Sequence, residues 1–540
     1  MLDFNKTYNE IYSEFNWKIP EYYNIGFDVC DKWADNHPEK LALINALKNG
    51  STEKYTFKDI KNLSNQTANL LTNRGVRKGD RVAILLSQTP ETAYAHVAIY
   101  KLGGIAVPLF NLFGEEALSF RLQNCGAKAI VTDLEGAKKI ILIEKQLPNL
   151  EHIFVIDGDH QQCINFHQER KKQSETFTLC KTLSEDPAVI IYTSGTTGQA
   201  KGALHAQRIL LGHLPGVEMS HNGFNNADDC FWTPADWAWI GGLYDGLMPA
   251  WHHGIPVVAH RFDKFTAEAA FQLIENYKIK NIFFPPTAMK VIRSTEPLAP
   301  LSVNSIASGG EPLGSELIRW GQETFGVTIN EFYGQTECNM VVSSCKKLFE
   351  PTLGAIGLPV PGHQVKIIDY NGIEVPHNSI GNIAVKSPDP IMFLEYWGSP
   401  ESTKKKFLND WLLTGDKGLM DEKGFIQFVG RDDDVITSSG YRIGPGEIED
   451  CLLGHPYISN VGVIGVPDKV RTEAVKAFIV LKSDITPSEE LTKEIQNFVK
   501  SHLAAHEYPR QIEYIDVLPL TTTGKIIRNK LRVLHKQNNS

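Results

Sequence analysis

The 540-residue sequence lacks an excess of basic charge, a long apolar run and an N-terminal leader pattern. Its 54 Lys and Arg residues are outnumbered by 63 Asp and Glu residues, so the formal net charge is −9. Proteins that bind duplex nucleic acid or anionic membranes need clustered positive charge, which this balance does not supply. No window reaches the ~18 apolar residues of a membrane-spanning helix, and no signal-peptide pattern opens the chain. We therefore expect a cytoplasmic protein with no nucleic-acid partner and no integral membrane contact.

The cysteines show no spacing typical of a disulfide-rich or zinc-binding fold. The eight cysteines include no CxxC pair and no Cys/His group with zinc-ligand spacing; they are Cys30, Cys125, Cys163, Cys180, Cys230, Cys338, Cys345 and Cys451. Scattered cysteines are typical of reduced thiols in a reducing compartment. A disulfide-rich fold and a zinc finger are both disfavoured.

Short β-rich runs alternate with longer amphipathic segments through most of the chain. Strands are expected at 81–86 and 104–109 with a helix near 90–102 between them, and the alternation recurs across 255–284. This pattern indicates α/β layers with mainly parallel sheets. From about residue 354 short strands with turn dipeptides follow, and after residue 430 a second α/β pattern begins.

These changes predict an α/β fold in two parts. The larger part is an N-terminal body, residues 1–430, of layered α/β subdomains plus a β-rich subdomain. The smaller part is a mobile C-terminal α+β cap, residues 435–540. The acidic turn at 431–434 is expected to be the hinge between them.

The most informative segment is a loop rich in Gly, Ser and Thr at residues 192–202. A buried-strand run precedes it, and a helical segment is expected to follow. Glycines let backbone N–H groups approach phosphate oxygens, while hydroxyls and one lysine add donors and charge. The phosphate-binding candidates are Thr193, Ser194, Gly195, Thr196, Thr197, Gly198 and Lys201. No GxxxxGK[ST] pattern is present, which disfavours a P-loop kinase or GTPase, and such a loop standing alone can also be a surface connection.

This loop resembles the signature loop of the AMP-forming adenylate superfamily, which comprises acyl-CoA synthetases, luciferases and nonribosomal adenylation domains. Further segments follow in the order of that family, at 308–313 with 331–337, 411–416, 438–449 and 519–528. The resemblance covers about residues 50–532 and is closest to the medium-chain acyl-CoA synthetases. It implies that ATP, Mg²⁺ and coenzyme A take part.

The resemblance assigns residues to adenine, ribose and magnesium. Tyr333 offers a ring face to the purine, Thr336 a donor to phosphate and Glu337 a carboxylate oxygen to Mg²⁺. Asp416 and Arg431 match the ribose contacts. The nucleotide set is completed by Gly310, Glu311, Pro312, Glu331, Phe332, Gly334, Gln335 and Phe428.

The resemblance also places the catalytic and thiol-binding groups. Lys525 matches the lysine that bridges the attacking carboxylate and the α-phosphate, with Thr336 and Glu337 completing the catalytic set. Asp433 matches the hinge position, and Asp432 is the alternative. The thioester loop and the coenzyme A candidates are Ser439, Gly440, Tyr441, Arg442, Arg471 and Tyr508. The segment 438–449 is equally compatible with a strand-to-helix turn.

The residues of the acyl pocket indicate which class of carboxylic acid the resemblance implies as substrate. Acetate-specific relatives carry a Trp where this chain has Gly334, so an open pocket floor is expected. Trp239 matches a substrate-wall position and Gly241 leaves space beside it, although Trp237 and Trp239 are also compatible with core packing. The expected substrate is a medium-chain, branched or aromatic carboxylic acid rather than acetate.

Together these residues predict an ATP-dependent, AMP-forming acyl-CoA ligase without a side-chain nucleophile. A carboxylate and ATP give acyl-AMP and pyrophosphate, and coenzyme A then accepts the acyl group and releases AMP. Positioning and charge stabilisation dominate the first step. The alternatives are an adenylation enzyme that loads a separate carrier protein and a catalytically silent nucleotide-binding protein of the same fold.

Overall fold

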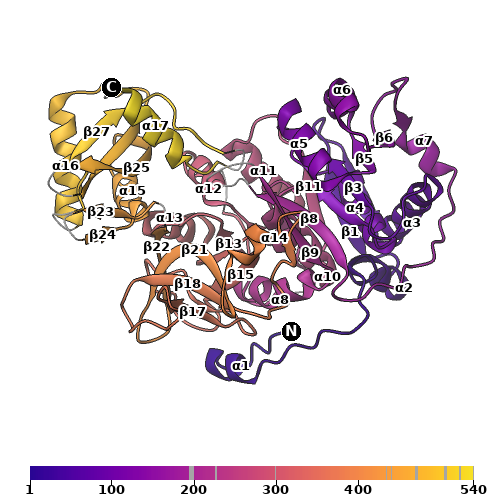
Figure 1. The fold of residues 1–540 in the computed structure, drawn as a ribbon, viewed down its shortest axis with the longest axis horizontal. Coiled ribbons are helices and arrows are strands. Elements are labelled where there is room, and N and C mark those ends of the chain that lie inside the picture. The colour runs from indigo at the N-terminus through magenta and orange to yellow at the C-terminus, as the bar shows by residue number, and fades with distance from the viewer. Residues whose placement is uncertain are drawn as a thin grey trace.

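The computed structural model describes residues 1–193, 200–224, 228–297, 300–432, 434–438, 441–468, 472–503, 507–521 and 524–538, without the side chains of Thr437, Tyr441 and Arg442. Figure 1 shows a large body, from the indigo N-terminus to the orange strands, with a smaller yellow C-terminal lobe at one end. Four sheets organise the described residues.

The first sheet has eight strands in the order β19-β9-β8-β4-β3-β5-β6-β7. Its strands are β3 (Arg81–Leu85), β4 (Ile105–Pro108), β5 (Ala129–Thr132), β6 (His152–Val155), β7 (Ile164–Asn165), β8 (Pro187–Thr193), β9 (Lys201–Ala206) and β19 (Glu395–Tyr396). The strands from β8 to β7 run parallel, whereas β9 is antiparallel to both of its neighbours.

The second sheet has nine strands in the order β16-β15-β14-β13-β12-β10-β11-β1-β2. Its strands are β1 (Leu41–Ala46), β2 (Thr52–Thr56), β10 (Phe231–Trp232), β11 (Val257–His260), β12 (Asn281–Phe283), β13 (Ser305–Gly309), β14 (Ile329–Gln335), β15 (Cys338–Ser343) and β16 (Leu358–Pro359). The central strands are parallel, and β2, β15 and β16 are antiparallel.

Two smaller sheets follow along the chain. An antiparallel sheet forms the β-rich subdomain from β17 (Val365–Ile368), β18 (Gly381–Lys386), β20 (Phe407–Leu408), β21 (Trp411–Met420) and β22 (Ile426–Arg431). The cap sheet comprises β23 (Ile436–Ser438), β24 (Tyr441–Ile443), β25 (Ile458–Asp468), β26 (Thr472–Leu481) and β27 (Gln511–Tyr514), of which β27 alone pairs in parallel among the described strands.

Helices cover these sheets. In the body they are α1 (Tyr8–Glu14), α2 (Lys32–Asn36), α3 (Phe57–Asn73), α4 (Pro90–Lys101), α5 (Glu115–Cys125), α6 (Leu134–Ile143), α7 (Phe166–Lys171), α8 (Ile209–Ser220), α9 (Ile240–Gly242), α10 (Met248–His252), α11 (Ala267–Tyr277), α12 (Pro286–Ile292), α13 (Ser315–Phe325) and α14 (Pro400–Lys404). The cap has α15 (Pro445–Leu453), α16 (Glu489–His502) and α17 (Arg528–Asn538). Short 3-10 or π turns are η1 (Phe27–Asp31), η2 (Glu144–Gln146) and η3 (Leu243–Leu247).

Local sequence explains where several helices begin. Thr56 and Asp59 form a reciprocal capping box at α3, which satisfies two otherwise unpaired N–H groups. Thr89 caps α4, where Pro90 occupies the first turn without losing a hydrogen bond. The expected strand, helix and strand across 81–109 are therefore confirmed.

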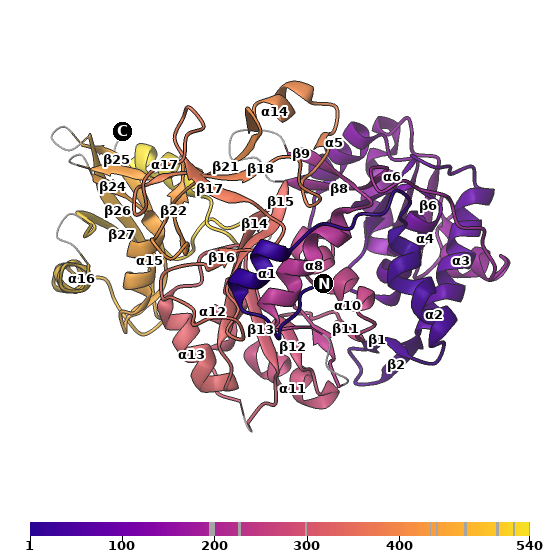
Figure 2. The ribbon, with the colours of Figure 1, turned by 90° about the horizontal axis from the view of Figure 1, so that it is seen from below.

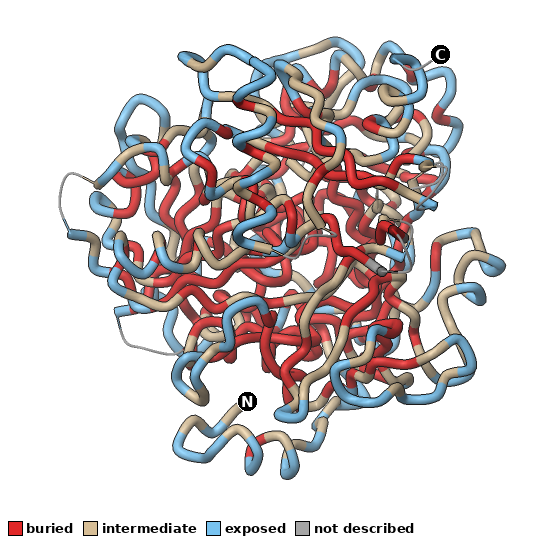
Figure 3. The backbone as a smooth tube through the Cα atoms, turned by 90° about the vertical axis from the view of Figure 1, so that its left-hand side faces the viewer, coloured by how far each residue is buried: buried red, intermediate tan, exposed pale blue. Residues whose placement is uncertain are grey.

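The body and the cap have separate hydrophobic cores. The largest body cluster includes the fully buried Trp237, Tyr244 and Trp251, whereas Ile448 and Val463 belong to a cluster made of cap residues. In Figure 3 the buried stretches run through the interior and exposed residues occupy the outer turns. The N-terminal α1 lies against the body beside β16 in Figure 2, where the Tyr8 hydroxyl donates to the Pro359 carbonyl.

The element that follows the loop at 192–202 is a strand and not the expected helix. The loop at 192–202 does not lead directly into a helix: β9 comes first and pairs antiparallel with β8. The reason is burial, because every residue of β9 after Lys201 is buried, and a strand within a sheet satisfies the backbone of such a run. The loop is thus the connection of a β-hairpin, and α8 begins only at Ile209.

The structure also bears on the cysteines and on the search for membrane-spanning segments. All eight cysteines are free thiols. No helix within the described ranges combines the length and the apolar character needed to cross a membrane.

Candidate active site

Two adjacent strands bring the predicted nucleotide residues together. In the parallel pair β13 and β14, Ser308 lies opposite Glu331 and Gly309 opposite Phe332. The residues that follow are 310–312, after the end of β13, and 333–335, the last part of β14, which pairs with β15. They therefore lie at the same edge, beyond the carboxyl end of β13, where parallel α/β sheets bind ligands. Gly310 has φ +97°, a conformation that favours glycine.

Glu331 supports this edge from within. Its Oε1 accepts a hydrogen bond from the Leu313 backbone N–H at 3.1 Å. Burial raises the pKa of the Glu331 carboxyl to about 7, although that hydrogen bond opposes the shift. Glu331 thus stabilises the turn after Pro312.

The predicted ribose contacts form a connected group. The Tyr333 hydroxyl donates to Asp416 Oδ2 at 2.6 Å, and Arg431 Nε lies 3.2 Å from Asp416 Oδ1. Asp416 and Arg431 are paired across β21 and β22, and the Phe428 ring centroid lies 6.3 Å from that of Tyr333. Burial raises the pKa of Asp416, and the charge of Arg431 opposes this. A carboxylate that can accept from two hydroxyls is therefore held beside an aromatic face.

Glu337 is buried in the turn between β14 and β15, directly before β15 begins. Its Oε1 accepts a hydrogen bond from the Tyr396 hydroxyl and lies 4.0 Å from Lys406 Nζ. Lys201 Nζ lies 5.1 Å from the Tyr396 ring centroid, which brings the predicted phosphate lysine to the same side. Neither Tyr396 nor Lys406 was predicted from the sequence, because no recognisable motif surrounds them.

The phosphate loop is described only at its base. Thr193 and Lys201 lie opposite each other where β8 and β9 meet. The remaining predicted loop residues, Ser194, Gly195, Thr196, Thr197 and Gly198, lie outside the described residues.

Lys525 of the cap reaches the body. Its Nζ lies 6.0 Å from the Trp239 ring centroid. Burial lowers the pKa of Lys525, while the charges of Glu311 and Asp416 oppose the shift. Burial likewise raises the pKa of Glu311, whose Oε1 has no hydrogen-bond partner. The structure therefore places the predicted catalytic lysine among the predicted nucleotide residues.

Arg528 anchors the segment that carries Lys525. It donates two hydrogen bonds to the Glu449 carboxylate, at 2.8 and 2.7 Å, and one to the Val463 carbonyl at 3.2 Å. Its Nη1 also lies 3.5 Å from Asp434 Oδ2. This paired geometry is among the strongest that side chains form, so the Lys525 segment is tied to α15 and to the residue after the predicted hinge.

Trp239 forms an aromatic wall beside Lys525. A Cβ atom on Gly241 would lie 2.8 Å from its ring, and one on Gly310 would lie 3.0 Å away, so the indole rests against both glycines. The Phe283 ring centroid lies 5.8 Å from that of Trp239. Trp237, in contrast, is fully buried, as the core interpretation expects.

Gly334 does not leave the expected opening. A Cβ atom on Gly334 would lie 2.3 Å from the Met340 backbone N and 2.6 Å from Asn339 Cα. The direction that a side chain would take is filled by backbone, so this conformation requires glycine for close packing. Space for an acyl group has to come from elsewhere along the wall.

The predicted thiol-binding residues are only partly described. Ser439, Gly440, Arg471 and the predicted hinge Asp433 lie outside the described residues, as do the side chains of Tyr441 and Arg442. Tyr508 lies on the cap, where its hydroxyl accepts a hydrogen bond from Arg510 at 2.7 Å. Lys500 Nζ lies 4.1 Å from its ring centroid.

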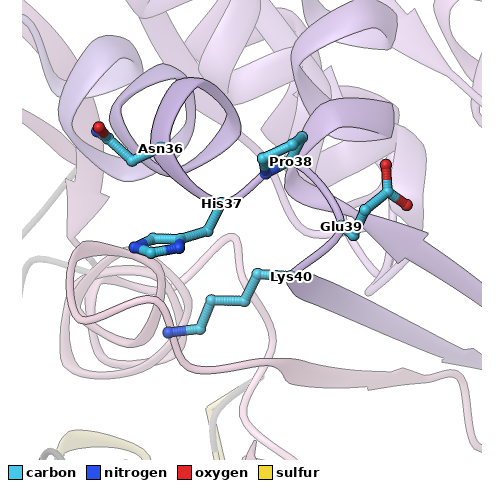
Figure 4. A pocket seen from close by; sticks show the side chains of 5 residues that line it. All are labelled: Asn36, His37, Pro38, Glu39 and Lys40. Carbon is cyan, nitrogen blue, oxygen red and sulfur yellow. The ribbon is translucent and has the colours of Figure 1, made fainter.

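A separate hollow of about 480 Å³ lies at the turn before β1. Its lining is Asn36, His37, Pro38, Glu39 and Lys40, as Figure 4 shows. None of the predicted site residues lines it.

Comparison with known proteins gives matches over nearly the whole chain. The model of the AMP-binding enzyme family matches residues 30–397, and that of the AMP-binding enzyme C-terminal domain matches residues 447–525. An acetyl-coenzyme A synthetase of Bacillus subtilis is 35% identical, covering 98% of this chain and 95% of its own. The mitochondrial acyl-coenzyme A synthetase ACSM3 of Rattus norvegicus is 33% identical, and the match covers 97% of this chain and 93% of that protein.

Solved structures agree with these matches. The anthranilate CoA ligase AuaEII in complex with anthranoyl-AMP superposes with a TM-score of 0.89 at 30% identity, covering 96% of this chain and 99% of that one. ATP-bound MatB from Rhodopseudomonas palustris superposes with a TM-score of 0.85 at 26% identity, covering 96% of this chain and 99% of that one.

Proposed function

Because the chain belongs to the AMP-binding enzyme family and is an AMP-forming acyl-CoA ligase, we propose that its acid substrate is a medium-chain, branched or aromatic carboxylic acid rather than acetate. The observation that carries this proposal is the aromatic wall beside Lys525. The half-buried Trp239 presents apolar surface next to the reacting centre, and the fully buried Phe283 packs against it. Such surface is stabilised by burying an apolar group larger than a methyl.

ATP binds, in this proposal, at the edge of β13 and β14. Tyr333 and Phe428 contact the adenosine, and Asp416 with Arg431 accepts and donates hydrogen bonds at the ribose. The loop at 193–201 holds the β- and γ-phosphates. The distances among Tyr333, Asp416 and Arg431 support this arrangement, because all three already form one connected group.

Glu337 is the proposed ligand of Mg²⁺. Mg²⁺ is commonly held by one or two carboxylates together with substrate phosphates, and the described residues contain no group of three His, Cys, Asp or Glu that would form an all-protein site. A single buried carboxylate near Lys201 fits that mode. When bound there, Mg²⁺ supplies charge that stabilises the departing pyrophosphate.

Lys525 is the proposed catalytic group of the first step. A substrate carboxylate oxygen forms a bond to the α-phosphorus of ATP, and the bond from that phosphorus to the bridging oxygen of pyrophosphate breaks. Lys525 orients the carboxylate and stabilises negative charge on the α-phosphate, and Thr336 donates to the phosphate. In the second step the coenzyme A sulfur attacks the acyl carbon and AMP leaves.

The cap is proposed to serve both steps by rotation about Asp433, with Asp432 as the alternative hinge. Rotation withdraws Lys525 and brings the loop with Ser439, Gly440, Tyr441 and Arg442 to the site. Arg471 and Tyr508 are the proposed coenzyme A contacts. The body of residues 1–430 and the cap of residues 435–540 are the units of this proposal. The two cores, one in the body and one in the cap, support it.

We also propose that the enzyme works in the cytoplasm. The eight free thiols support a reducing compartment. Immunodetection in fractions of the source cells tests this, and recovery in an oxidising compartment contradicts it.

The deciding experiment measures AMP release from ATP and Mg²⁺ with acetate, butyrate, hexanoate, octanoate, 2-methylbutyrate and benzoate, each with and without coenzyme A. We expect the highest kcat/KM with a four- to eight-carbon or aromatic acid, and full turnover only with coenzyme A. Acetate as the best substrate would contradict the proposed substrate class. Turnover without coenzyme A would contradict the ligase assignment.

A further inference from the structure

Lys406 is the last of three consecutive lysines that follow one another from the end of α14. Lys404 and Lys405 are exposed, whereas Lys406 is turned inward, and its side chain is 19% exposed. Its backbone carbonyl accepts a hydrogen bond from the Leu413 N–H at 2.7 Å, which fixes the residue against β21. The inward position is therefore set by the fold.

The Lys406 ammonium has three donors, and all three are used. Nζ donates to Gln335 Oε1 at 2.6 Å and to the carbonyls of Leu413 and Thr414 at 3.2 Å each. These acceptors lie on β14 and β21, the two strands that carry the proposed adenosine and ribose contacts. One side chain thus joins both halves of the nucleotide site.

We propose that Lys406 is a positioning residue for nucleotide binding, which fixes the orientation of Gln335 and the separation of β14 from β21. This inference rests on the proposed function, because it assumes that nucleotide binds between these strands. Lys406 does not touch the reacting atoms in this role; it acts through Gln335 and the segment from Thr414 to Asp416.

The orientation of Gln335 follows from donor and acceptor chemistry. An ammonium group can only donate, so the amide presents its oxygen to Lys406 and its nitrogen elsewhere. That nitrogen donates to the Thr414 carbonyl at 2.8 Å. Without Lys406, the Gln335 oxygen has no ammonium to hold it, and only the hydrogen bond from its nitrogen to the Thr414 carbonyl orients the amide.

Charge gives Lys406 a second effect on the same site. Its Nζ lies 4.0 Å from Glu337 Oε1. Glu337 and Asp416 are two buried carboxylates in a site that receives a nucleotide phosphate, and like charges repel most strongly where water is excluded. The positive charge of Lys406 reduces that repulsion.

The test is calorimetric titration of AMP without metal or acid, which reports nucleotide affinity without turnover. We expect Lys406→Met to weaken AMP binding by about tenfold, because the charge-assisted hydrogen bond that orients Gln335 is lost. Lys406→Arg keeps the charge and donors and is expected to retain most of the affinity. Lys405→Met removes the same charge from the exposed neighbour and is expected to bind AMP as the wild type does.

A double-mutant cycle separates positioning from general destabilisation. If Lys406 acts through Gln335, then Lys406→Met and Gln335→Met are not additive in AMP affinity, whereas a purely structural role makes their effects independent. Wild-type AMP affinity in folded Lys406→Met, or additive effects in the cycle, would overturn the inference. Should Lys406→Met not fold, Lys406→Gln is measured in its place against the same criteria. Asp416→Ala with wild-type affinity would instead refute the proposed ribose site.

Discussion

Asp450 of the cap accepts a hydrogen bond from the backbone N–H of Ser315 in the body, with the two atoms 3.3 Å apart. Ser315 is the first residue of α13, so a carboxylate from one part of the chain faces the N-terminus of a helix in the other. Anions are stabilised at that end of a helix. A Cβ atom on Gly314 would lie 2.0 Å from Asp450 Oδ1, so this approach depends on glycine.

Removal of this contact is expected to slow the first half-reaction. Asp450→Ala should reduce acid-dependent pyrophosphate exchange by about 2- to 30-fold, because a helix N-cap contributes ~0.5–2 kcal/mol to the orientation in which Lys525 is in place. Asp484→Ala, an exposed acidic residue of the cap, serves as the control. Equal exchange rates in the two variants would show that the contact does not hold the cap.

Lys525→Ala tests the catalytic assignment. We expect acyl-AMP formation to fall by about 10²–10³-fold, since the lysine stabilises charge that develops at the α-phosphate. Formation of acyl-CoA from supplied acyl-AMP should be retained, because that step does not need the lysine. Lys530→Ala removes an exposed charge nearby and should leave both rates unchanged. Similar losses in both half-reactions of Lys525→Ala would contradict its role.

Substitutions of Trp239 and Trp237 are expected to have different effects, although the two residues are close in sequence. Trp239→Ala should raise kcat/KM for octanoate relative to butyrate by about tenfold. Removal of the indole frees space for the longer acyl chain, and each additional methylene buried there contributes a modest gain in specificity. Trp237→Phe should lower the melting temperature without changing that ratio, because Trp237 is fully buried in the core. An unchanged ratio in Trp239→Ala would show that the indole does not border the acyl chain.

Gly334 gives a prediction opposite to that of a simple pocket floor. Gly334→Trp is expected to reduce stability and activity with every acid, since even a Cβ atom meets the backbone at 2.3 Å. A fully folded Gly334→Trp enzyme that prefers acetate would restore the open-floor interpretation. Thermal unfolding together with the acid panel distinguishes these outcomes.

Glu331 should make stability depend on pH. Burial raises its pKa to about 7 in the folded protein, against an ordinary value of 4.5. Between these values the folded protein binds more protons than the unfolded chain, so the free energy of unfolding falls as pH rises from about 4.5 to 7, by up to about 3 kcal/mol. Glu331→Gln should remove this part of the slope in urea unfolding at pH 5 and pH 8. An identical slope in wild type and variant would contradict the assignment.

Periodicity and motifs predicted the alternating layers, because each strand and helix has a local pattern of buried positions. They also predicted Tyr333, Asp416, Arg431 and Lys525 as site residues, because each lies in a short segment that resembles a motif of a known family. Contacts between distant segments had no such signal. Tyr396 in β19 contacts Glu337 across 59 residues, and Lys406, which follows α14, contacts Gln335 across 71 residues. Asp450 meets Ser315 across 135 residues. The local environment of Gly334 likewise depends on how β15 packs, which no single segment reveals.

The attachment of Arg528 to Glu449 has a consequence for the order of events in turnover. Glu449 and Asp450 are consecutive in α15, so the same helix turn holds both the lysine segment and the contact with α13. A cap that leaves the body must carry Lys525 away as it breaks from Ser315, in one movement. The enzyme would then have no intermediate conformation in which coenzyme A enters while Lys525 still faces the adenylate. Movement of α15 would therefore commit each acyl-AMP to thioester formation.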